Sequence, residues 1–244
     1  MRTIRLHVDL PLTPGSDATL PATAAEHATR VLRLRSGDAL VLFNGDGHDY
    51  PAHLLAVSRA GASVRIAARG APAAPESSLT LTLAQGIARG DKMDLILQKA
   101  TELGVTRIVP LITARTEVRL DAERSEKRMA HWHGVISGAC EQCGRARLPE
   151  LSAPRVLAEW APTADALDGL RLCLDPEAAG GPRQLPAFTA ACLVVGPEGG
   201  LAPADHALLQ QAGFAGMRLG PRVLRTETAG LAALAALQAL HGDF

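Results

Sequence analysis

Aromatic residues are scarce in this chain, where they make up 3% of 244 residues. That scarcity disfavours a nucleic-acid surface built mainly from stacked rings. Long apolar runs are also missing, since none approaches the roughly 20 residues needed to span a bilayer. The first ten residues contain Arg2, Arg5 and Asp9, where a secretory signal would need an apolar stretch. We therefore expect a cytoplasmic protein that makes no use of a membrane.

Cysteine is also rare, with four residues in the chain. Cys140 and Cys143 have the Cys-x-x-Cys spacing of many zinc sites, but a structural zinc ion needs four ligands. The other two cysteines lie inside apolar runs, where a cysteine is usually a small buried hydrophobe. His131 and His133 are two positions apart, whereas two ligands on one helical face need a spacing of four. The sequence therefore predicts no metal site.

Charge is balanced overall but unevenly distributed. The 25 basic and 25 acidic residues cancel, which argues against a protein that coats nucleic acid by bulk charge. Residues 1–155 hold 20 Lys and Arg against 16 Asp and Glu, whereas residues 156–244 hold 5 against 9. A polyanion is therefore expected to prefer the first part. Arginine provides 22 of the basic residues, which suits bidentate phosphate binding but is also explained by genome composition.

Residues 1–70 read as a small β-rich module. Thr23 followed by Glu26 matches a helix capping box, and the helix is expected to continue through an apolar face at residues 31–34. The Asn-Gly and Asp-Gly steps at residues 44–47 predict a hairpin between two of the strands. Strands are expected at residues 3–8, 39–43, 48–57 and 63–68. Two prolines among small residues at 70–75 then indicate a linker.

After the linker, strands alternate with helices, which predicts a mostly parallel sheet covered on both faces. Strands are expected at residues 79–85, 106–112, 171–175, 191–196 and 217–219, and helices at 91–103, 121–143, 203–212 and 227–240. Gly104 stands where the first of these helices should end. The last helix is apolar all round, so it is expected to be buried or to lie in an oligomer interface.

Two loops combine glycine and proline after a buried strand and before a helix. They are Gly196-Pro-Glu-Gly-Gly-Leu201 and the segment from Leu219 to Thr228. Open α/β sheets bind ligands at this end of their strands. Neither loop has the glycine fingerprint of a P-loop or of a dinucleotide-binding fold. The loops are either ligand-binding loops or simply tight turns.

At these loops the chain resembles a known family. LVVGPEGGL and LGPRVLRTETAGLAALAAL are similar to the two C-terminal signature motifs of the RsmE family, bacterial methyltransferases that use S-adenosylmethionine (SAM) to modify uridine N3 in 16S ribosomal RNA. RVLRLRSGD with LFNGDGHDY, QGIARGDKMDLILQKATELGVTRIVPLITART and EQCGRARLPE match further family motifs in the expected order.

The resemblance implies an architecture and partners. It implies an α/β fold of the SPOUT type, with a trefoil-knotted parallel sheet in residues 76–244, preceded by a PUA-like RNA-binding domain in residues 1–70. It further implies a homodimer, SAM as cofactor and 16S rRNA within the small ribosomal subunit as partner, rather than DNA or a membrane. The implied product is N3-methyluridine of the m3U1498 type.

The resemblance also implies roles for individual residues. The cofactor-binding candidates are Gly196, Gly200, Leu219, Gly220 and Leu224, with Leu174 from the preceding strand end. Arg225 is the candidate cation that stabilises the uracil anion, while Glu198 either accepts a proton or orients its loop. RNA-binding candidates are Arg2, Arg5, Arg30, Arg33, Lys99, Glu102, Arg115, Gln142 and Arg145. For Lys99 and Glu102 the alternative is a salt-bridged surface.

Three other functions stay open. A related SPOUT-type RNA methyltransferase would share these motifs but act on a different nucleotide. A nucleotide-dependent oxidoreductase would share the α/β rhythm, but it needs a glycine fingerprint with an acidic residue about 20 positions later. A non-catalytic RNA-binding module would explain the N-terminal arginines but not the two glycine-bearing loops.

Overall fold

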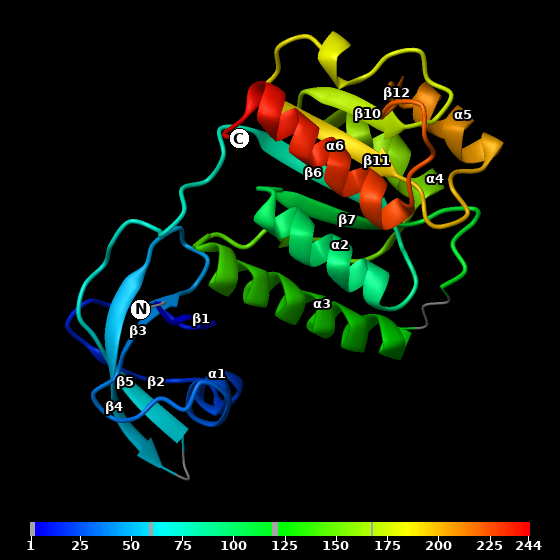
Figure 1. Ribbon diagram of the computed structural model, residues 1–244. Helices are drawn as coiled ribbons and strands as arrows, with labels where there is room; N and C mark the ends of the chain where they lie inside the picture. The colour runs from blue at the N-terminus through cyan, green and yellow to red at the C-terminus, as the bar shows by residue number, and fades with distance from the viewer. Residues whose placement is uncertain (1–2, 59–60, 119–121, 167) are drawn as a thin grey trace. The chain divides into compact units, whose positions relative to one another are not determined.

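The computed structural model describes residues 3–58, 61–118, 122–166 and 168–244 and divides the chain into two compact units (Figure 1). The first unit comprises Met1–Glu76 together with Ser137–Leu148, and the second comprises Ser77–Ile136 and Pro149–Phe244. The return of residues 137–148 to the first unit was not foreseen from the sequence. Among the described residues, no helix is long and apolar enough to cross a membrane.

The first unit is built on a five-stranded sheet in the order β1-β3-β4-β5-β2. Its strands are β1 (Arg5–His7), β2 (Asp17–Thr19), β3 (Ala39–Phe43), β4 (Tyr50–Ser58) and β5 (Gly61–Ile66). The predicted hairpin is confirmed, because β3 and β4 pair antiparallel. Gly45 and Gly47 in its turn have φ angles of 89° and 91°, a conformation that glycine adopts without steric cost. Strand β2 was not predicted.

The helix of the first unit begins differently from the prediction. Helix α1 (Ala22–Glu26) starts directly after Pro21, so Thr23 lies inside the helix and makes no capping hydrogen bond. Pro21 occupies the N-cap position instead, without a side-chain capping hydrogen bond. The chain continues as a π-helical turn, η1 (His27–Val31), and Val31 is 66% exposed, so the expected apolar face fails at this residue.

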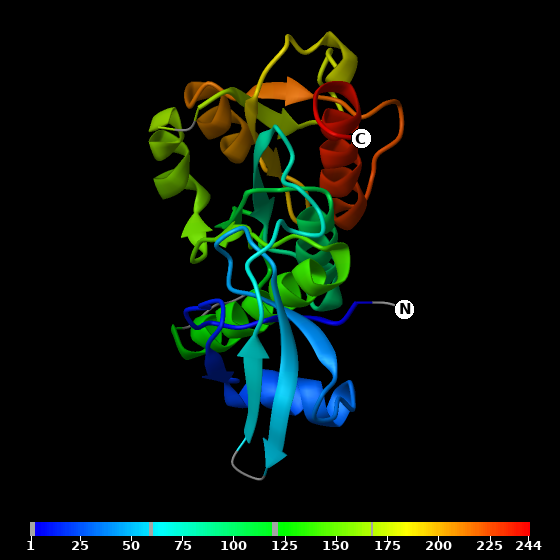
Figure 2. The same ribbon diagram turned by 90° about the vertical axis from the view of Figure 1, so that its left-hand side faces the viewer.

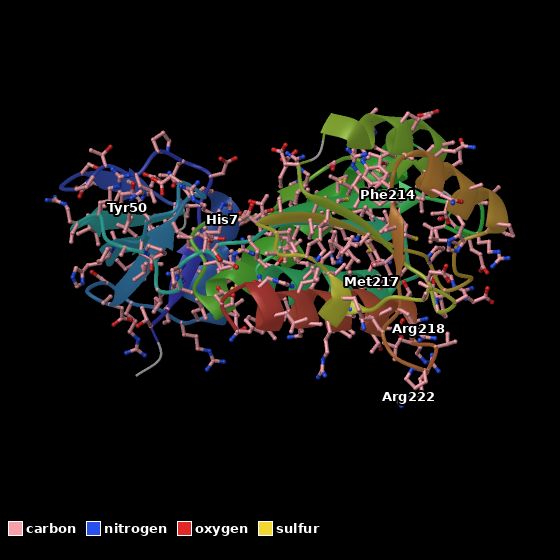
Figure 3. The ribbon with its side chains drawn as sticks, turned by 90° about the horizontal axis from the view of Figure 1, so that it is seen from above. His7, Tyr50, Phe214, Met217, Arg218 and Arg222 are labelled. Carbon is pink, nitrogen blue, oxygen red and sulfur yellow. The ribbon has the colours of Figure 1, made fainter. Side chains whose placement is uncertain are left out.

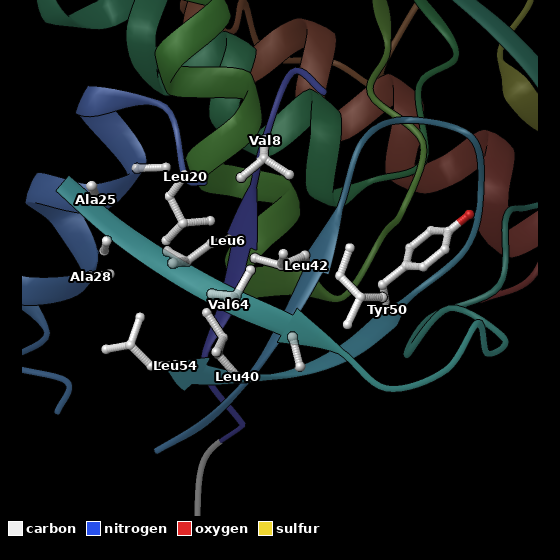
Figure 4. Packing of buried hydrophobic residues seen from close by; sticks show 14 of the residues in the cluster. Leu6, Val8, Leu20, Ala25, Ala28, Leu40, Leu42, Tyr50, Leu54 and Val64 are labelled. Carbon is white, nitrogen blue, oxygen red and sulfur yellow. The ribbon is translucent and has the colours of Figure 1, made fainter. Parts of the chain in front are cut away.

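The core of the first unit lies between its sheet and α1 with η1 (Figure 4). Alternate residues of the strands point into it, as expected for a sheet with one buried face. The largest contributions come from leucine and valine side chains that are almost wholly buried, among them Leu6, Val8, Leu40, Leu42, Leu54 and Val64.

The second unit contains a parallel sheet in the order β12-β10-β11-β6-β7-β8, with β9 also pairing with β7. Its strands are β6 (Thr80–Gly86), β7 (Arg107–Ile112), β8 (Glu150–Leu151), β9 (Arg155–Val156), β10 (Leu170–Leu174), β11 (Ala190–Val195) and β12 (Ala215–Met217). The predicted α/β class is confirmed. The last strand ends two residues earlier than predicted, so Arg218 and Leu219 lie beyond the sheet.

Helices cover both faces of this sheet (Figure 2). Helices α2 (Asp91–Glu102) and α6 (Thr226–His241) pack on one face, and α4 (Leu157–Trp160), the 3₁₀ turn η2 (Ala161–Ala166) and α5 (Pro203–Gln211) on the other. A further turn, η3 (Pro182–Gln184), contacts α6. Gly104 follows α2 with a φ of 80°, as predicted for a helix end. Helix α6 buries Leu234 and Leu237 but leaves Leu240 45% exposed.

The long helix α3 (Ala122–Cys143) begins in the second unit and ends in the first. The predicted first residue, Asp121, lies outside the described part of the chain. Gly144 ends the helix with a φ of 94°. Arg145, which directly follows Gly144, is buried in the first unit.

A buried ion-pair network joins the two segments of the first unit. Arg5, whose side chain is 5% exposed, donates to Asp49 and to the carbonyl of Arg145, and its guanidinium lies 4.8 Å from the ring centroid of Phe43. The Arg145 side chain, 6% exposed, pairs with Glu76 at 2.6 Å. Removing one partner of such a pair leaves an unpaired charge in a medium that solvates it poorly.

Substitution of Arg5 by alanine is expected to lower the free energy of unfolding by about 3–5 kcal/mol, because it leaves the Asp49 carboxylate buried without its partner. The matched control is Arg65→Ala, which removes an exposed arginine paired with Asp17 on the same sheet and should change little. Chemical denaturation of both variants measures the difference. Equal, small losses of stability would show that the buried pair does not hold the first unit together.

Candidate functional site

A pocket of about 440 Å³ lies in the second unit beyond the ends of β10, β11 and β12. Its walls are three loops, at residues 174–176, 195–201 and 217–227, together with Lys92 and His206. The loops at residues 195–201 and 217–227 are the two that the sequence singled out, and the structure brings them together with residues 174–176 at one edge of the sheet. A volume of this size is typical of sites for small ligands.

The first loop is shaped by its own backbone. A Cβ atom on Gly196 would lie 2.8 Å from the carbonyl carbon of Gly200 and 2.9 Å from the amide nitrogen of Leu201. Gly200 has a φ of 70°, and its N–H donates to the carbonyl of Pro197 at 2.8 Å. Glycine at position 196 is therefore required for the tight turn itself, in addition to any approach of a ligand.

A hydrogen-bonded cluster, made of the buried Gln85 and Thr226 and the half-buried Gly196, ties this loop to its neighbours. The Thr226 hydroxyl, at the start of α6, donates to the Gly196 carbonyl at 2.6 Å. The Gln85 amide, fully buried at the end of β6, donates to the Thr226 hydroxyl at 3.0 Å and to the Gly86 carbonyl at 2.8 Å. The cluster fixes the start of α6 against the ends of two strands.

Gly86 allows this close packing. A Cβ atom at position 86 would lie 2.5 Å from the backbone nitrogen of Pro197 and 2.9 Å from the carbonyl carbon of Gly196. Gln85, Gly86 and Thr226 were not predicted as site residues from the sequence. The available signal was their position inside two of the matched motifs.

Glu198 is held by contacts with the segment around the start of α2. Its Oε1 accepts the Arg89 N–H at 3.0 Å and lies 3.3 Å from Lys92 Nζ. Burial by itself raises the pKa of this carboxyl, but the hydrogen bonds from Arg89, from its own backbone N–H and from Lys92 bring the pKa below its ordinary value. A carboxylate with a lowered pKa, whose Oε1 already accepts from Arg89 and Lys92, favours the loop-orienting role over that of a general base. Lys92 also reaches Glu227 at 4.0 Å.

All eight cofactor and catalytic candidates line the pocket: Leu174, Gly196, Glu198, Gly200, Leu219, Gly220, Leu224 and Arg225. Gly220 has a φ of 80°, and a Cβ there would meet only open space, so the requirement at this position is conformational. Arg225 occupies the N-cap position of α6, where its carbonyl accepts the N–H groups of Thr228 and Ala229 at 2.9 and 2.8 Å. That anchoring fixes the backbone from which the exposed Arg225 side chain extends.

The RNA-binding candidates are divided between the two units. Arg2 lies outside the described residues. Arg5 and Arg145 are buried in the ion-pair network of the first unit, a placement that favours a structural role. Arg30 pairs with Glu26 at 2.6 Å.

The remaining candidates also come from both units. Lys99 pairs with Glu102 at 2.8 Å on α2, as in the salt-bridged alternative. Arg115 donates to the Gly199 carbonyl at 2.8 Å and so supports the first pocket loop. Exposed candidates in the first unit are Gln142 at the end of α3 and Arg33, which has a φ of 57°.

The cysteines are free thiols. Burial raises the pKa of Cys140, Cys173 and Cys192 to about 12 each, so these thiols stay protonated at neutral pH. Within the described residues, no group of three potential ligand side chains is placed to hold a metal ion.

The chain matches two protein-family models. The RNA methyltransferase domain matches residues 75–238, and the RNA methyltransferase PUA domain matches residues 20–67. The small β-rich first unit and the α/β second unit agree with that order.

Individual relatives cover nearly the whole chain. Ribosomal RNA small subunit methyltransferase E of Mycobacterium tuberculosis is 33% identical over 96% of this chain and 90% of the relative, and its counterpart from Bacillus subtilis is 29% identical over 89% of each. The enzyme of that name from Neisseria gonorrhoeae, solved bound to S-adenosyl methionine, is 35% identical with a TM-score of 0.91. Lpg2936 from Legionella pneumophila, solved with SAM, is 41% identical with a TM-score of 0.95. Both structures cover 100% of this chain and are themselves covered completely. The chain belongs to the ribosomal RNA small subunit methyltransferase E family of RNA methyltransferases.

Proposed function

We propose that this protein transfers the methyl group of SAM to N3 of a uridine in 16S ribosomal RNA, producing the m3U1498 modification. It is a SAM-dependent rRNA methyltransferase by family. The observation that carries the proposal is the pocket, whose walls are the two signature loops of the sequence, in a fold shared over its full length with two structures solved with SAM.

The loops suit a ligand held mainly by main-chain contacts. We assign Gly196, Gly200, Leu219, Gly220 and Leu224 to cofactor binding, with Leu174 at the end of β10. Glycines let the ligand approach the backbone closely, and the buried cluster beneath them holds the loops in place before the ligand arrives. Preorganisation of this kind reduces the ordering that binding would otherwise require.

The residues at the pocket also fit the chemistry of transfer. Bound SAM supplies an electrophilic sulfonium methyl group, so the protein has chiefly to align N3 with that carbon and to favour loss of the N3 proton. Arg225, exposed at the pocket, would stabilise the negative charge that develops on the uracil oxygens. Glu198 would hold its loop in register through Arg89 and Lys92.

The two units divide the work in this proposal. Residues 1–70 form the PUA-like RNA-binding domain and residues 76–244 the SPOUT-type methyltransferase domain, with residues 137–148 completing the former. A trefoil knot accounts for three loops that meet at one pocket and are tied to the start of α6. A homodimer is supported by α6, which leaves an apolar face of partly exposed residues, among them Leu231, Ala232, Ala235, Ala239 and Leu240. We assign the protein to the cytoplasm, where its ribosomal substrate would be found.

The direct test is methyl transfer to small ribosomal subunits from cells that lack this protein, followed by mass mapping of RNA fragments. We expect one methyl group on N3 of uridine 1498. A methyl group on another nucleotide would identify a different target within the superfamily. Failure of the folded protein to bind SAM, together with binding of NAD, would contradict the assignment altogether.

Arg225→Ala should lower the rate of methyl transfer by roughly 10²–10³-fold, because a preorganised positive charge is lost where the uracil anion forms. SAM affinity should change far less. The control is Arg107→Ala, which removes an exposed arginine of the same unit that does not line the pocket. Single-turnover rates and SAM titrations separate the two effects. Parallel losses of both would show that Arg225 builds the cofactor site instead.

Gly86→Ala should weaken SAM binding roughly tenfold, because the new Cβ meets the backbone of Pro197 and must displace the first pocket loop. Gly134→Ala on α3 is the matched control, since a Cβ there meets nothing within 4 Å. Isothermal titration with SAM measures both, and thermal unfolding checks that the variants are folded. Unchanged affinity in a folded Gly86→Ala protein would mean that the loop position does not control binding.

A further inference from the structure

The basic residues of the chain's final segment are concentrated at the pocket. Residues 156–244 hold five arginines and no lysine, against nine acidic residues. Three of these arginines, Arg218, Arg222 and Arg225, line the pocket. This segment is acidic overall, but most of its arginines line the pocket. The net charge of the segment therefore does not describe the charge at the pocket.

These three arginines differ from most others in their surroundings. In the same unit, Arg89 pairs with Glu117 at 2.7 Å and Arg107 with Glu150 at 2.9 Å. By contrast, the guanidinium groups of Arg218, Arg222 and Arg225 are exposed and have no hydrogen bond or ion pair to any described residue. Three like charges within eight residues repel one another. Because the three guanidinium groups are exposed and unpaired among the described residues, they are available to bind an anion, which would also relieve this repulsion.

Arg218 and Arg222 lie on the loop between β12 and α6, whereas Arg225 lies at the start of α6. Strand β12 ends at Met217, which is 1% exposed. Arg218 is the first residue beyond the sheet, and it is exposed. Arg222 lies four residues further along the loop. Figure 3 shows both side chains at the same edge of the second unit, with Arg222 at the outer end of the loop. Arg225 lies at the start of α6, nearer the buried cluster.

The methyl donor does not account for this much positive charge. SAM carries a sulfonium, an ammonium and one carboxylate, so its net charge is positive and it needs at most one anion-binding partner. The anion that the pocket must also admit is the RNA strand on either side of the target nucleotide. Arginine binds phosphate oxygens in a bidentate fashion, and an unpaired nucleotide brings its flanking phosphates close to the pocket entrance.

We propose that Arg218 and Arg222 bind the phosphates that flank the target nucleotide and so set the register of the RNA at the pocket. The inference rests on the proposed function and deepens it, because it places a sequence-independent RNA contact in the catalytic unit as well as in the PUA-like domain. Phosphate contacts position a nucleic acid without reading its bases. Recognition of the target would then depend on Arg225 and the pocket.

The test compares Arg218→Ala/Arg222→Ala with Arg107→Ala/Arg155→Ala, a double variant that removes the same charge from the same unit outside the pocket. The probe is the unmethylated small ribosomal subunit, titrated across a salt series, with SAM affinity measured in parallel. The pocket variant should bind subunits roughly tenfold more weakly or worse. Its salt dependence should be shallower by about 1.4, since each phosphate contact on a single strand contributes about 0.7. SAM affinity should stay at the wild-type value.

A third variant, Arg222→Lys, retains the charge on the exposed part of the loop and should keep most of the salt dependence. If the pocket variant loses SAM affinity while its subunit affinity stays normal, these arginines bind the carboxylate of the cofactor and the inference is overturned. Equal losses in the pocket variant and its control would reduce the effect to net charge and also overturn it. A wild-type protein that neither binds SAM nor methylates subunits would contradict the proposed function itself.

Discussion

The hydrogen bonds among Gln85, Gly196 and Thr226 are the constraint on which the site depends. They join β6, the loop after β11 and the start of α6, three segments separated by more than a hundred residues at the widest. Because Gln85 and Thr226 are buried, their polar groups must find partners within the protein or lose a hydrogen bond to water without replacement. The Gln85 Oε1 atom has no hydrogen-bond partner among the described residues, so Gln85 takes part in the cluster only through its side-chain nitrogen, Nε2. The arrangement therefore favours one position of the loops.

Charge is used in two different ways in the two units. In the first, Arg5 and Arg145 are buried and paired, and their guanidinium groups link segments that are distant in sequence. In the second, Lys92 lies between two carboxylates, while Arg218, Arg222 and Arg225 have no carboxylate partner in the part of the chain that the structure describes. The same residue type thus serves as an internal connection in one place and as an available cation in another. Exposure and partners decide between these roles, and neither can be read from composition.

The sequence predicted the features that depend on local chemistry. The hairpin around Gly45 and Gly47, the end of α2 at Gly104 and the two pocket loops all follow from backbone preferences or from matched motifs. Features that depend on distant contacts were missed. The burial of Arg5 requires Asp49, and that of Arg145 requires Glu76, 69 residues away. Two further differences from the prediction depend on packing between distant segments, which a local sequence pattern cannot predict. They are the place of residues 137–148 in the first unit and the position of β12, which lies two residues earlier than expected.

The Thr226 hydroxyl is expected to hold the pocket loops in the form that binds the cofactor. The most direct measurement is the affinity for SAM, by isothermal titration, of Thr226→Val compared with Thr228→Val, an exposed threonine on the same helix. Valine keeps the shape of threonine but removes the hydroxyl between Gln85 and Gly196. We expect Thr226→Val to bind SAM roughly tenfold more weakly, because it loses the hydrogen bonds to Gly196 and from Gln85, and Thr228→Val to bind as wild type. Wild-type affinity in a folded Thr226→Val protein would contradict the account.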